Sequence, residues 1–343
     1  MKGDPAVRAE GLGYFAFSKG SLLQMRTKLR LTLLFAGLVF ATALAQGQSG
    51  QVKFVYGVWG YSDSQPFSSP QGIFYDRWNR EIYVCDSGNH QVVIFDSTGF
   101  PLYRFNHWLR RSEGEEKILG EPRNLVVSKA GDIFLIDNLT GFVDILGQRG
   151  NSVDKLILQD IPEFENVKIR PEFLAIDTLD NLYVATSGER VKILVFDKNL
   201  HLTSHFGRKG EEEGELKTVT GLWVDDEGRI YVTDADAHFC VQVFSPEGEF
   251  LLGFGGHDIN REDFSLPTGV VTTADGTIFV ADELRQVVKA FDSDGQFLSW
   301  FGGFGDGSGA MRYPRNITGD GNGELFVVER VGGRYQKFVL RKD

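Results

Sequence analysis

Residues 82–95 read IYVCDSGNHQVVIF, and this stretch decides the fold. Two short runs of β-branched and aromatic residues flank the polar cluster 86–90, which is the pattern of a β-hairpin. Hairpins of the same form return five times, as IFLIDNLTGFVDIL, LYVATSGERVKILVF, IYVTDADAHFCVQVF, IFVADELRQVVKAF and LFVVERVGGRYQKFVL. A repeated supersecondary unit therefore organises the chain.

The repeat has a period of about 48 residues. The residue that ends the first strand of each hairpin recurs at intervals of 51, 49, 48, 48 and 47 residues, at Asp86, Asp137, Thr186, Asp234, Asp282 and Glu329. A second phrase begins fifteen or sixteen residues before each of them: PQGIFYD, PRNLVVS, PEFLAID, VTGLWVD, PTGVVTT and PRNITGD. With the polar turns between them, each unit predicts four antiparallel strands, for example 72–76, 82–86, 91–95 and 102–105.

Six such units predict an all-β fold, a six-bladed β-propeller of four-stranded antiparallel blades. A solenoid is the competing architecture, but a complete four-stranded sheet in each unit favours a blade. The sixth unit stops after its third strand, whereas residues 51–60, QVKFVYGVWG, resemble the fourth strands FLLGFGG and FLSWFGG of other units. We therefore expect the N-terminal strand to close the last blade, which leaves no open sheet edge.

The first 45 residues have a different character from the repeats. Three basic residues at 26–30 precede the apolar run 31–44, which ends in Ala-Leu-Ala. This pattern predicts a signal peptide over 25–45, preceded by an over-long start or unstructured leader over 1–24, with Met1 and Met25 as alternative starts. A membrane anchor is the alternative, but the run is shorter than the ~20 residues of a span. We expect an exported propeller over 46–343, periplasmic or extracellular, without stable membrane insertion after cleavage.

The charge of the chain argues against one class of partner, and the positions of its cysteines argue against a disulfide. Residues 1–45 hold six Lys/Arg and two Asp/Glu, so the remainder of the chain carries −11 − 4 = −15. An acidic body is a poor match for nucleic acid, whose affinity comes mostly from phosphate neutralisation. The two cysteines, Cys85 and Cys240, lie in hairpins three repeats apart and are not expected to form a disulfide.

The phrase Pro-x-Gly-Ile followed by IYVCDSGNHQVVIF resembles the NHL repeat, with DSGNHQV as its most recognisable part. The resemblance covers roughly residues 51–341. It is close in units 1, 4 and 5 and weaker in unit 2, which has Asn138-Leu139-Thr140, and in unit 3, where Thr186 replaces Asp. It implies a six-bladed propeller, in agreement with the repeat count. It also implies an alternative function, since this chain resembles propellers that are peptide-amidating zinc lyases or gluconolactonase-type hydrolases.

The acidic series has two interpretations. A ring of carboxylates could hold a divalent cation at the channel mouth. The recurrence of the acid at one place in five of six units instead favours a structural role, in which each carboxylate caps the N–H groups of its own turn.

Histidines at 90, 107, 238 and 257 fall in loops, but no motif positions three of them as zinc ligands. We therefore predict structural or solvated histidines, no catalytic residue, no metal and no cofactor, with Ca²⁺ or Zn²⁺ only under the hydrolase or lyase alternative.

The best candidate ligand site is the channel mouth. The phrase Pro-Arg-Asn occurs at 122–124 and again at 314–316, at the same position of two units. Guanidinium groups there could receive a carboxylate or an acidic peptide segment; the alternative is that they neutralise neighbouring glutamates. The predicted ligand-binding residues are Arg123, Asn124, Arg315, Asn316, Glu172 and Arg170. The sequence as a whole predicts a monomeric, non-enzymatic scaffold that binds a protein or peptide partner.

Overall fold

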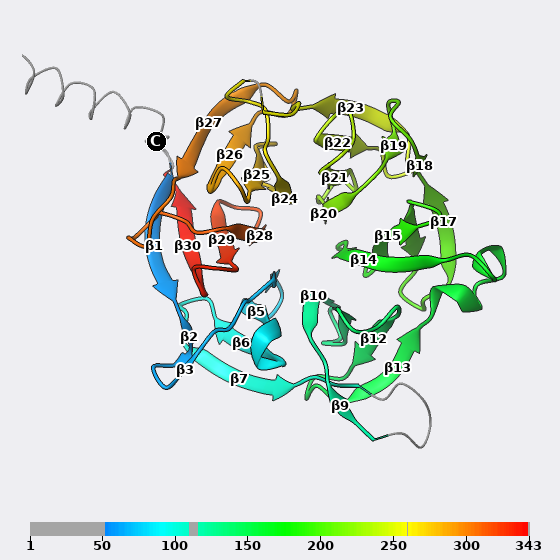
Figure 1. Cartoon of the computed structure of the whole chain (residues 1–343), viewed down its shortest axis with the longest axis horizontal. Helices are drawn as coiled ribbons and strands as arrows, with labels where there is room; N and C mark the ends of the chain where they lie inside the picture. Colours follow the sequence, from blue (N-terminus) through cyan, green and yellow to red (C-terminus); the bar gives the residue numbers. More distant parts are fainter. Residues whose placement is uncertain (1–51, 110–115, 259, 342–343) are drawn as a thin grey trace, which may run out of the picture. The chain divides into compact units, whose positions relative to one another are not determined.

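The computed structural model describes residues 52–109, 116–258 and 260–341, all within the compact unit 48–343. The predicted signal peptide, leader and start sites lie outside the described residues. Six four-stranded antiparallel sheets are arranged in a ring in this unit, as Figure 1 shows. No helix in the described part of the chain is long and apolar enough to cross a membrane.

Blade 1 contains the hairpin that opened the sequence. Its strands are β4 (Gly72–Asp76), β5 (Glu81–Asp86), β6 (Gln91–Asp96) and β7 (Pro101–Asn106), hydrogen-bonded in that order. The predicted strands are therefore confirmed to within one residue at each end. β5 and β6 are almost wholly buried because blades pack on both of their faces, whereas β7 lies on the rim and is mostly exposed.

The next four blades repeat this order from the channel outward. Blade 2 holds β10 (Pro122–Val127), β11 (Ile133–Asp137), β12 (Val143–Leu146) and β13 (Ser152–Leu156). Blade 3 holds β14 (Ile169–Ile176), β15 (Leu182–Gly188), β16 (Ile193–Phe196) and β17 (Leu202–Phe206). Blade 4 holds β20 (Val219–Val224), β21 (Ile230–Asp234), β22 (Val241–Phe244) and β23 (Phe250–Phe254). Blade 5 holds β24 (Pro267–Thr272), β25 (Ile278–Asp282), β26 (Val287–Phe291) and β27 (Phe297–Gly302).

Blade 6 joins the two ends of the described chain. Its strands are β28 (Pro314–Gly319), β29 (Glu324–Glu329), β30 (Arg334–Leu340) and, on the outside, β1 (Val52–Val58). β1 pairs antiparallel with β30 from Val52 opposite Leu340 to Val58 opposite Tyr335. Aromatic side chains reinforce the pairing, with the rings of Phe54 and Phe338 6.1 Å apart. The predicted closure by the N-terminal strand is confirmed.

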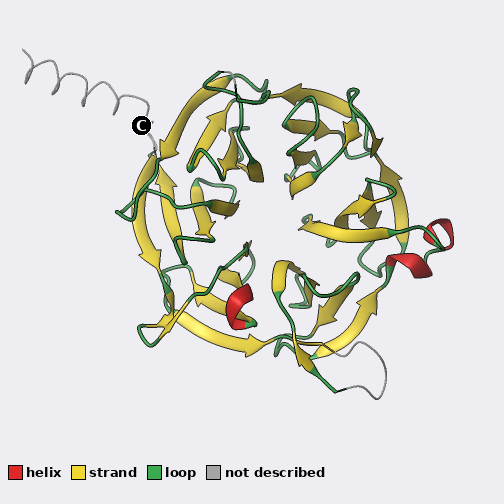
Figure 2. Ribbon diagram, viewed as in Figure 1, coloured by secondary structure: helices red, strands yellow, loops and turns green. Residues whose placement is uncertain are grey.

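Short elements lie in the loops between blades and in the turn between β5 and β6. They are the strand pairs β2 (Gly60–Ser62) with β3 (Gln65–Pro66), β8 (Trp108–Leu109) with β9 (Ile118–Leu119), and β18 (Arg208–Lys209) with β19 (Glu215–Leu216). Three single 3₁₀ turns, η1 (Ser87–Asn89), η2 (Leu158–Asp160) and η3 (Pro162–Phe164), appear in red in Figure 2.

The glycine of the Pro-x-Gly phrase lets neighbouring inner strands approach closely. A Cβ at Gly72 would lie 2.4 Å from the carbonyl oxygen of Arg123 in the next blade. A Cβ at Gly221 would lie 2.9 Å from the Cα of Gly269. Side chains at these positions would push the inner strands apart, so the phrase marks backbone packing around the channel.

Candidate functional site

The propeller has two unlike faces. We call the face that carries the loops between blades, together with the turns between the second and third strands, the loop-rich face. The opposite face carries the turns that follow the first and third strands, and we call it the turn face. The alternating direction of strands within each blade fixes this division.

A β-bulge builds the channel mouth on the loop-rich face. In five inner strands the pairing register skips the residue that follows the Pro-type position. A bulge leaves that residue out of the ladder and redirects its side chain. The skipped residues are Arg123, Glu172, Thr220, Thr268 and Arg315. The sequence repeat located these positions, but the bulge itself was not predicted.

Arg123 and Glu172 meet across blades 2 and 3. The Arg123 guanidinium forms an ion pair of 2.5 Å with the Glu172 carboxylate and donates a 2.9 Å hydrogen bond to the Glu172 carbonyl oxygen. It also lies 5.7 Å from the centre of the Phe173 ring. The same carboxylate accepts a hydrogen bond from the Ser187 hydroxyl. Glu172 therefore holds Arg123 in one orientation at the mouth.

Arg315 shares a carboxylate with a second arginine. Glu283 lies 3.4 Å from Arg315 Nη1 and 2.8 Å from Arg330 Nη2. Burial lowers the pKa of the Arg315 guanidinium; Glu283 and Glu172 oppose this shift, while Arg123 and Arg330 add to it. Two guanidinium groups on one carboxylate leave positive charge at the mouth. Arg123 is close enough for its charge to affect the pKa of Arg315.

The remaining predicted residues lie around this cluster in different roles. Asn124 is buried, and its side-chain oxygen accepts a 2.8 Å hydrogen bond from the Leu174 N–H in the neighbouring blade. Asn316 accepts from the Ile317 N–H, also at 2.8 Å. Arg170 is exposed and donates to the Thr140 carbonyl oxygen at 3.3 Å. The structure thus brings Arg123, Glu172 and Arg315 together, whereas the asparagine oxygens are engaged in inner-strand contacts.

Below the mouth, aromatic side chains occupy the channel. Phe74 in blade 1 and Trp223 in blade 4 hold the same repeat position in opposite blades, and smaller residues hold it in the others. Trp223 Nε1 donates to Thr272 Oγ1 at 3.0 Å. Cavities of only about 40 and 30 Å³ lie beside these rings, and each has room for about one water molecule. The mouth is therefore a shallow polar surface with an apolar floor.

The acidic series anchors the loops of this face. The Asp234 carboxylate accepts from the N–H groups of Lys217 and Thr218 in the incoming loop, at 2.7 and 2.9 Å, and from those of Asp236 and Ala237 in its own turn. The predicted turn-capping role is confirmed for Asp234 and likewise for Asp137 and Asp282.

Asp86 and Glu329 instead bind the incoming loop, through the N–H groups of Ser68 and Arg312. Burial raises the pKa of both acids although these hydrogen bonds oppose the shift. Their carboxylates therefore serve the fold, as those of the turn-capping acids do.

Buried polar residues of the third strands add a second anchor. Gln242 donates to the Glu215 carbonyl oxygen and accepts from the Gly214 N–H. Gln336 makes the equivalent pair of bonds with Ala310 and Gly309, and the buried Lys289 ammonium binds the Asp263 carbonyl oxygen. The loops are therefore fixed before any partner arrives.

The histidines of this face have local partners. His107 is buried, with Nδ1 2.8 Å from Asp137 and Nε2 3.0 Å from Asp144. Burial by itself would lower the pKa of His107. The hydrogen bonds and charges of the two carboxylates raise it by more than burial lowers it, so the net shift of the pKa is upward. His90 and His257 each contact a carbonyl oxygen, at 2.7 and 2.9 Å. Within the described ranges, no group of three or more His, Cys, Asp or Glu side chains is arranged to hold a metal ion.

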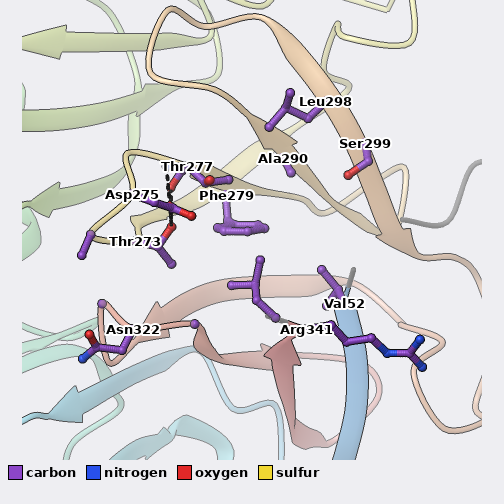
Figure 3. Close-up of a pocket in the computed structure, with 14 residues that line it drawn as sticks. Val52, Thr273, Asp275, Thr277, Phe279, Ala290, Leu298, Ser299, Asn322 and Arg341 are labelled. Carbon is purple, nitrogen blue, oxygen red and sulfur yellow. Dashed lines mark hydrogen bonds between the residues drawn. The ribbon is translucent and has the colours of Figure 1, made fainter. Parts of the chain in front are cut away.

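A cleft of about 350 Å³ opens between blades 5 and 6 on the turn face (Figure 3). Val52, Phe279 and Leu298 give it apolar walls, and Arg341 lies at one end. The Asp275 carboxylate accepts from Thr273 Oγ1 at 2.7 Å and from the Thr277 N–H at 3.1 Å, which closes its own turn. The cleft is a gap between blades in which the one lining carboxylate serves the fold.

Exposed apolar side chains are distributed unequally between the faces. Of the large hydrophobic residues that are exposed in the described chain, three lie on the turn face: Trp78, Phe100 and Leu179. Six more line the outermost strands: Val55, Leu102, Tyr103, Val153, Leu251 and Leu298. Eight lie on the loop-rich face: Trp59, Trp108, Ile118, Leu139, Ile157, Leu284, Phe304 and Val331. Apolar surface combined with arginine is the composition that marks the centres of protein interfaces.

The comparisons with known proteins agree with the fold. The NHL repeat model matches residues 67–95. Protein brain tumor of Drosophila melanogaster is 28% identical over 198 residues, which are 55% of this chain and 17% of that protein. NHL repeat-containing protein 3 of Mus musculus is 24% identical over 186 residues, 48% of this chain and 52% of that protein. The match thus spans about half or less of each relative.

Solved structures of enzymes share the architecture. A gluconolactonase from Xanthomonas campestris superposes with a TM-score of 0.59 at 13% identity, covering 87% of this chain and 93% of that one. A streptogramin B lyase superposes with a TM-score of 0.56 at 12% identity, covering 85% and 98%. At these identities the likeness is one of fold.

Proposed function

Because this chain is an NHL-repeat six-bladed β-propeller, we propose that it is a non-enzymatic scaffold whose loop-rich face binds a protein or peptide partner. The observation that carries the proposal is the unequal surface: eight exposed large apolar side chains on the loop-rich face against three on the turn face. They surround a mouth where Arg123 and Arg315 lie within electrostatic reach of each other. Loops anchored by buried polar groups lose little conformational freedom on binding, which favours affinity.

The arginine cluster supports an acidic segment in that partner. Arg315 and Arg330 share one glutamate, so an incoming carboxylate would find guanidinium donors that are not fully neutralised. The alternative, a metal-dependent hydrolase or lyase at the central channel, needs space for a substrate and polar ligands there. Beside Phe74 and Trp223 the channel holds cavities of only about 40 and 30 Å³, which favours the binding role at the loop-rich mouth; a larger space of about 490 Å³ lies at the turn-face end, around Arg77 and Asp226.

We also propose that the protein is exported and monomeric, in the periplasm or outside the cell. The basic residues at 26–30 followed by the apolar run 31–44 support export. The mass of the exported protein should correspond to a chain that begins at Gln46. A mature form that keeps residues 31–44 would contradict this.

The binding role is tested by the double variant Arg123→Ala/Arg315→Ala. The partner is captured by the wild-type protein from native extract and then titrated against both forms. Each charge-assisted contact contributes about 1.5–3 kcal/mol, so affinity should fall more than tenfold per site. Arg77→Ala on the turn face is the matched control and should bind as the wild type does. Unchanged affinity in the double variant, at an unchanged melting temperature, would place the partner elsewhere. Stoichiometric Zn²⁺ or Ca²⁺ that a chelator removes from the purified protein would favour the enzyme.

A further inference from the structure

One sector of the loop-rich face brings exposed apolar side chains and arginines together on neighbouring segments. It lies over blade 6, whose strands β1, β28, β29 and β30 appear in red and blue in Figure 1. We call it the blade-6 patch, and its apolar members are Trp59, Leu284, Phe304 and Val331, which are 50–72% exposed.

Direct contacts join the members of the patch on the blade 5 side. Leu284 follows Glu283, whose carboxylate binds Arg330, the residue before Val331. The Gly332 N–H then donates to the Arg312 carbonyl oxygen at 3.2 Å. The Arg312 guanidinium lies 5.8 Å from the centre of the Phe304 ring. These contacts place the segments that carry Leu284, Val331 and Phe304 next to one another.

Arg334 joins Trp59 to the same surface. Its guanidinium lies 5.7 Å from the Trp59 ring and donates to the carbonyl oxygens of Asp306 and Ala310 at 2.8 and 2.7 Å. Both acceptors belong to the loop that carries Phe304. Arg334 itself is buried and paired with Glu329 at 2.7 Å, so it links the Trp59 ring to the backbone of the loop that carries Phe304.

The charge of the patch is opposite to that of the far side of the face. Arg330 is nearly half exposed and shares Glu283 with Arg315, and Arg312 pairs with an exposed aspartate, Asp306, at 3.1 Å. Surface ion pairs of the latter kind are readily replaced. On the far side, the loop 207–216 carries four glutamates against one arginine and one lysine. An acidic segment would be attracted to the patch and repelled from that loop.

We propose that the blade-6 patch binds an acidic peptide segment that carries a bulky apolar side chain, with the apolar group among Trp59, Leu284, Phe304 and Val331 and the carboxylates on Arg312 and Arg330. This rests on the proposed binding function of the loop-rich face and adds the sector and the chemistry of the segment. Aromatic rings beside guanidinium groups form the type of centre that dominates binding energy at protein interfaces.

Fluorescence anisotropy with labelled hexapeptides tests the proposal on the purified protein. The acidic apolar peptide Glu-Glu-Leu-Phe-Glu-Glu should bind at least tenfold more tightly than Lys-Lys-Leu-Phe-Lys-Lys or Glu-Glu-Gly-Gly-Glu-Glu. The variant Phe304→Ser/Val331→Ser should weaken that binding at least tenfold at an unchanged melting temperature, because the changed side chains are exposed. The matched variant Phe100→Ser/Leu179→Ser changes two exposed apolar residues of the turn face and should bind as the wild type does.

Four results would overturn the proposal. One is equal binding of the three peptides. Another is undiminished binding by Phe304→Ser/Val331→Ser; if Leu139→Ser or Ile157→Ser weakens it instead, the loop-rich face still binds and only the sector is wrong. The third is concentration-dependent dimerisation that Phe304→Ser abolishes, since a second copy would then cover the patch. If peptide binding were instead lost in Phe100→Ser/Leu179→Ser, the proposed function of the loop-rich face would fail as well.

Discussion

The loop-rich face and the turn face are built from the same six sheets, but the connections between strands are held in different ways on the two faces. On the turn face the connections are short turns, and many of them are closed by the side chain of their first residue; Asp225, for example, accepts the N–H groups of Glu227 and Arg229 at 3.1 and 2.8 Å. On the loop-rich face the carboxylate of Asp234 reaches into a second segment and holds a loop in place. Aspartates therefore close single turns on the turn face, and on the loop-rich face they also hold the long loops in place.

The difference extends to the channel between the faces. At the turn face Arg77 of blade 1 pairs with Asp226 of blade 4, across the ring. Lys129 lies over the Trp78 ring at 4.6 Å. At the loop-rich face the bulged residues leave a polar mouth above Phe74 and Trp223. The Arg77–Asp226 pair thus links opposite blades at the turn face, and the loop-rich face is the one that we propose for recognition.

Opening the ring should have the largest effect on the free energy of unfolding. Deletion of residues 52–58 removes β1 and exposes the edge of β30. The four partly buried side chains Val52, Phe54, Tyr56 and Val58 contribute at most about 1.5–3 kcal/mol each, discounted for residual burial, so the free energy of unfolding should fall by several kcal/mol. Urea denaturation followed by circular dichroism measures this. A deletion variant that unfolds like the intact protein would show that β1 does not close blade 6.

Emptying the channel should have a smaller effect and should separate the two faces. Trp223→Ala removes an aromatic side chain from between blades 4, 5 and 6 and should destabilise the protein by about 3 kcal/mol through the cavity left behind. Partner affinity should change less than twofold, because the mouth residues keep their own ion pairs. Trp78→Ala, an exposed tryptophan of the turn face, is the matched control. A large loss of affinity in Trp223→Ala at temperatures where it is folded would mean that the channel interior takes part in binding.

The buried His107 links stability to pH on the loop-rich face. Its pKa is raised in the folded protein, where Asp137 and Asp144 outweigh burial. The stabilisation is therefore complete below the unfolded pKa of about 6.5 and is lost as the pH rises through the folded pKa. His107→Gln should cost about 1–3 kcal/mol in acid, and the difference from the wild type should shrink as the pH rises.

Thermal unfolding between pH 5 and 9 checks the His107 prediction. The control is His201→Gln, because His201 is largely exposed on the turn face. A difference between wild type and His107→Gln that stays constant over this range would contradict a charged His107.

Breaking the ion pair across the turn face should have the smallest effect. The side chains of Arg77 and Asp226 are 29% and 56% exposed, and pairs of this kind contribute about 0.2–1 kcal/mol. A double-mutant cycle with Arg77→Ala and Asp226→Ala measures the coupling free energy, which should shrink further in 1 M salt. A coupling above 2 kcal/mol would show that the turn face depends on this pair for closure.

The repeated phrases of the sequence were enough to predict the blades, because strand alternation and turn residues are local signals. The closure was also predictable, because residues 51–60 matched the fourth strand that the sixth unit lacks; the structure places that strand at Val52–Val58. The hydrogen-bond partner of each polar side chain could not be predicted from the sequence. Nothing local indicates that Asn124 turns its oxygen toward Leu174, or that the residue after the proline bulges from its strand.

The aromatic groups in the channel illustrate the same limit. Phe74 and Trp223 stand at one repeat position in opposite blades, and that coincidence is visible in the sequence once the units are aligned. Their role depends on the radius of the closed ring, which is a property of all six blades together. Site chemistry that arises from several blades is therefore less predictable than the blades themselves.

The central claim, that recognition belongs to the loop-rich face, is tested most directly by photo-crosslinking from both faces. A photoreactive phenylalanine analogue is placed at Leu139 or Phe304 on the loop-rich face and at Phe100 or Leu179 on the turn face, all of them exposed positions. We predict that irradiation in native extract yields a discrete crosslinked partner from Leu139 or Phe304, and that Arg123→Ala/Arg315→Ala removes the adduct. A partner crosslinked from Phe100 or Leu179 and not from the other two positions would contradict the account.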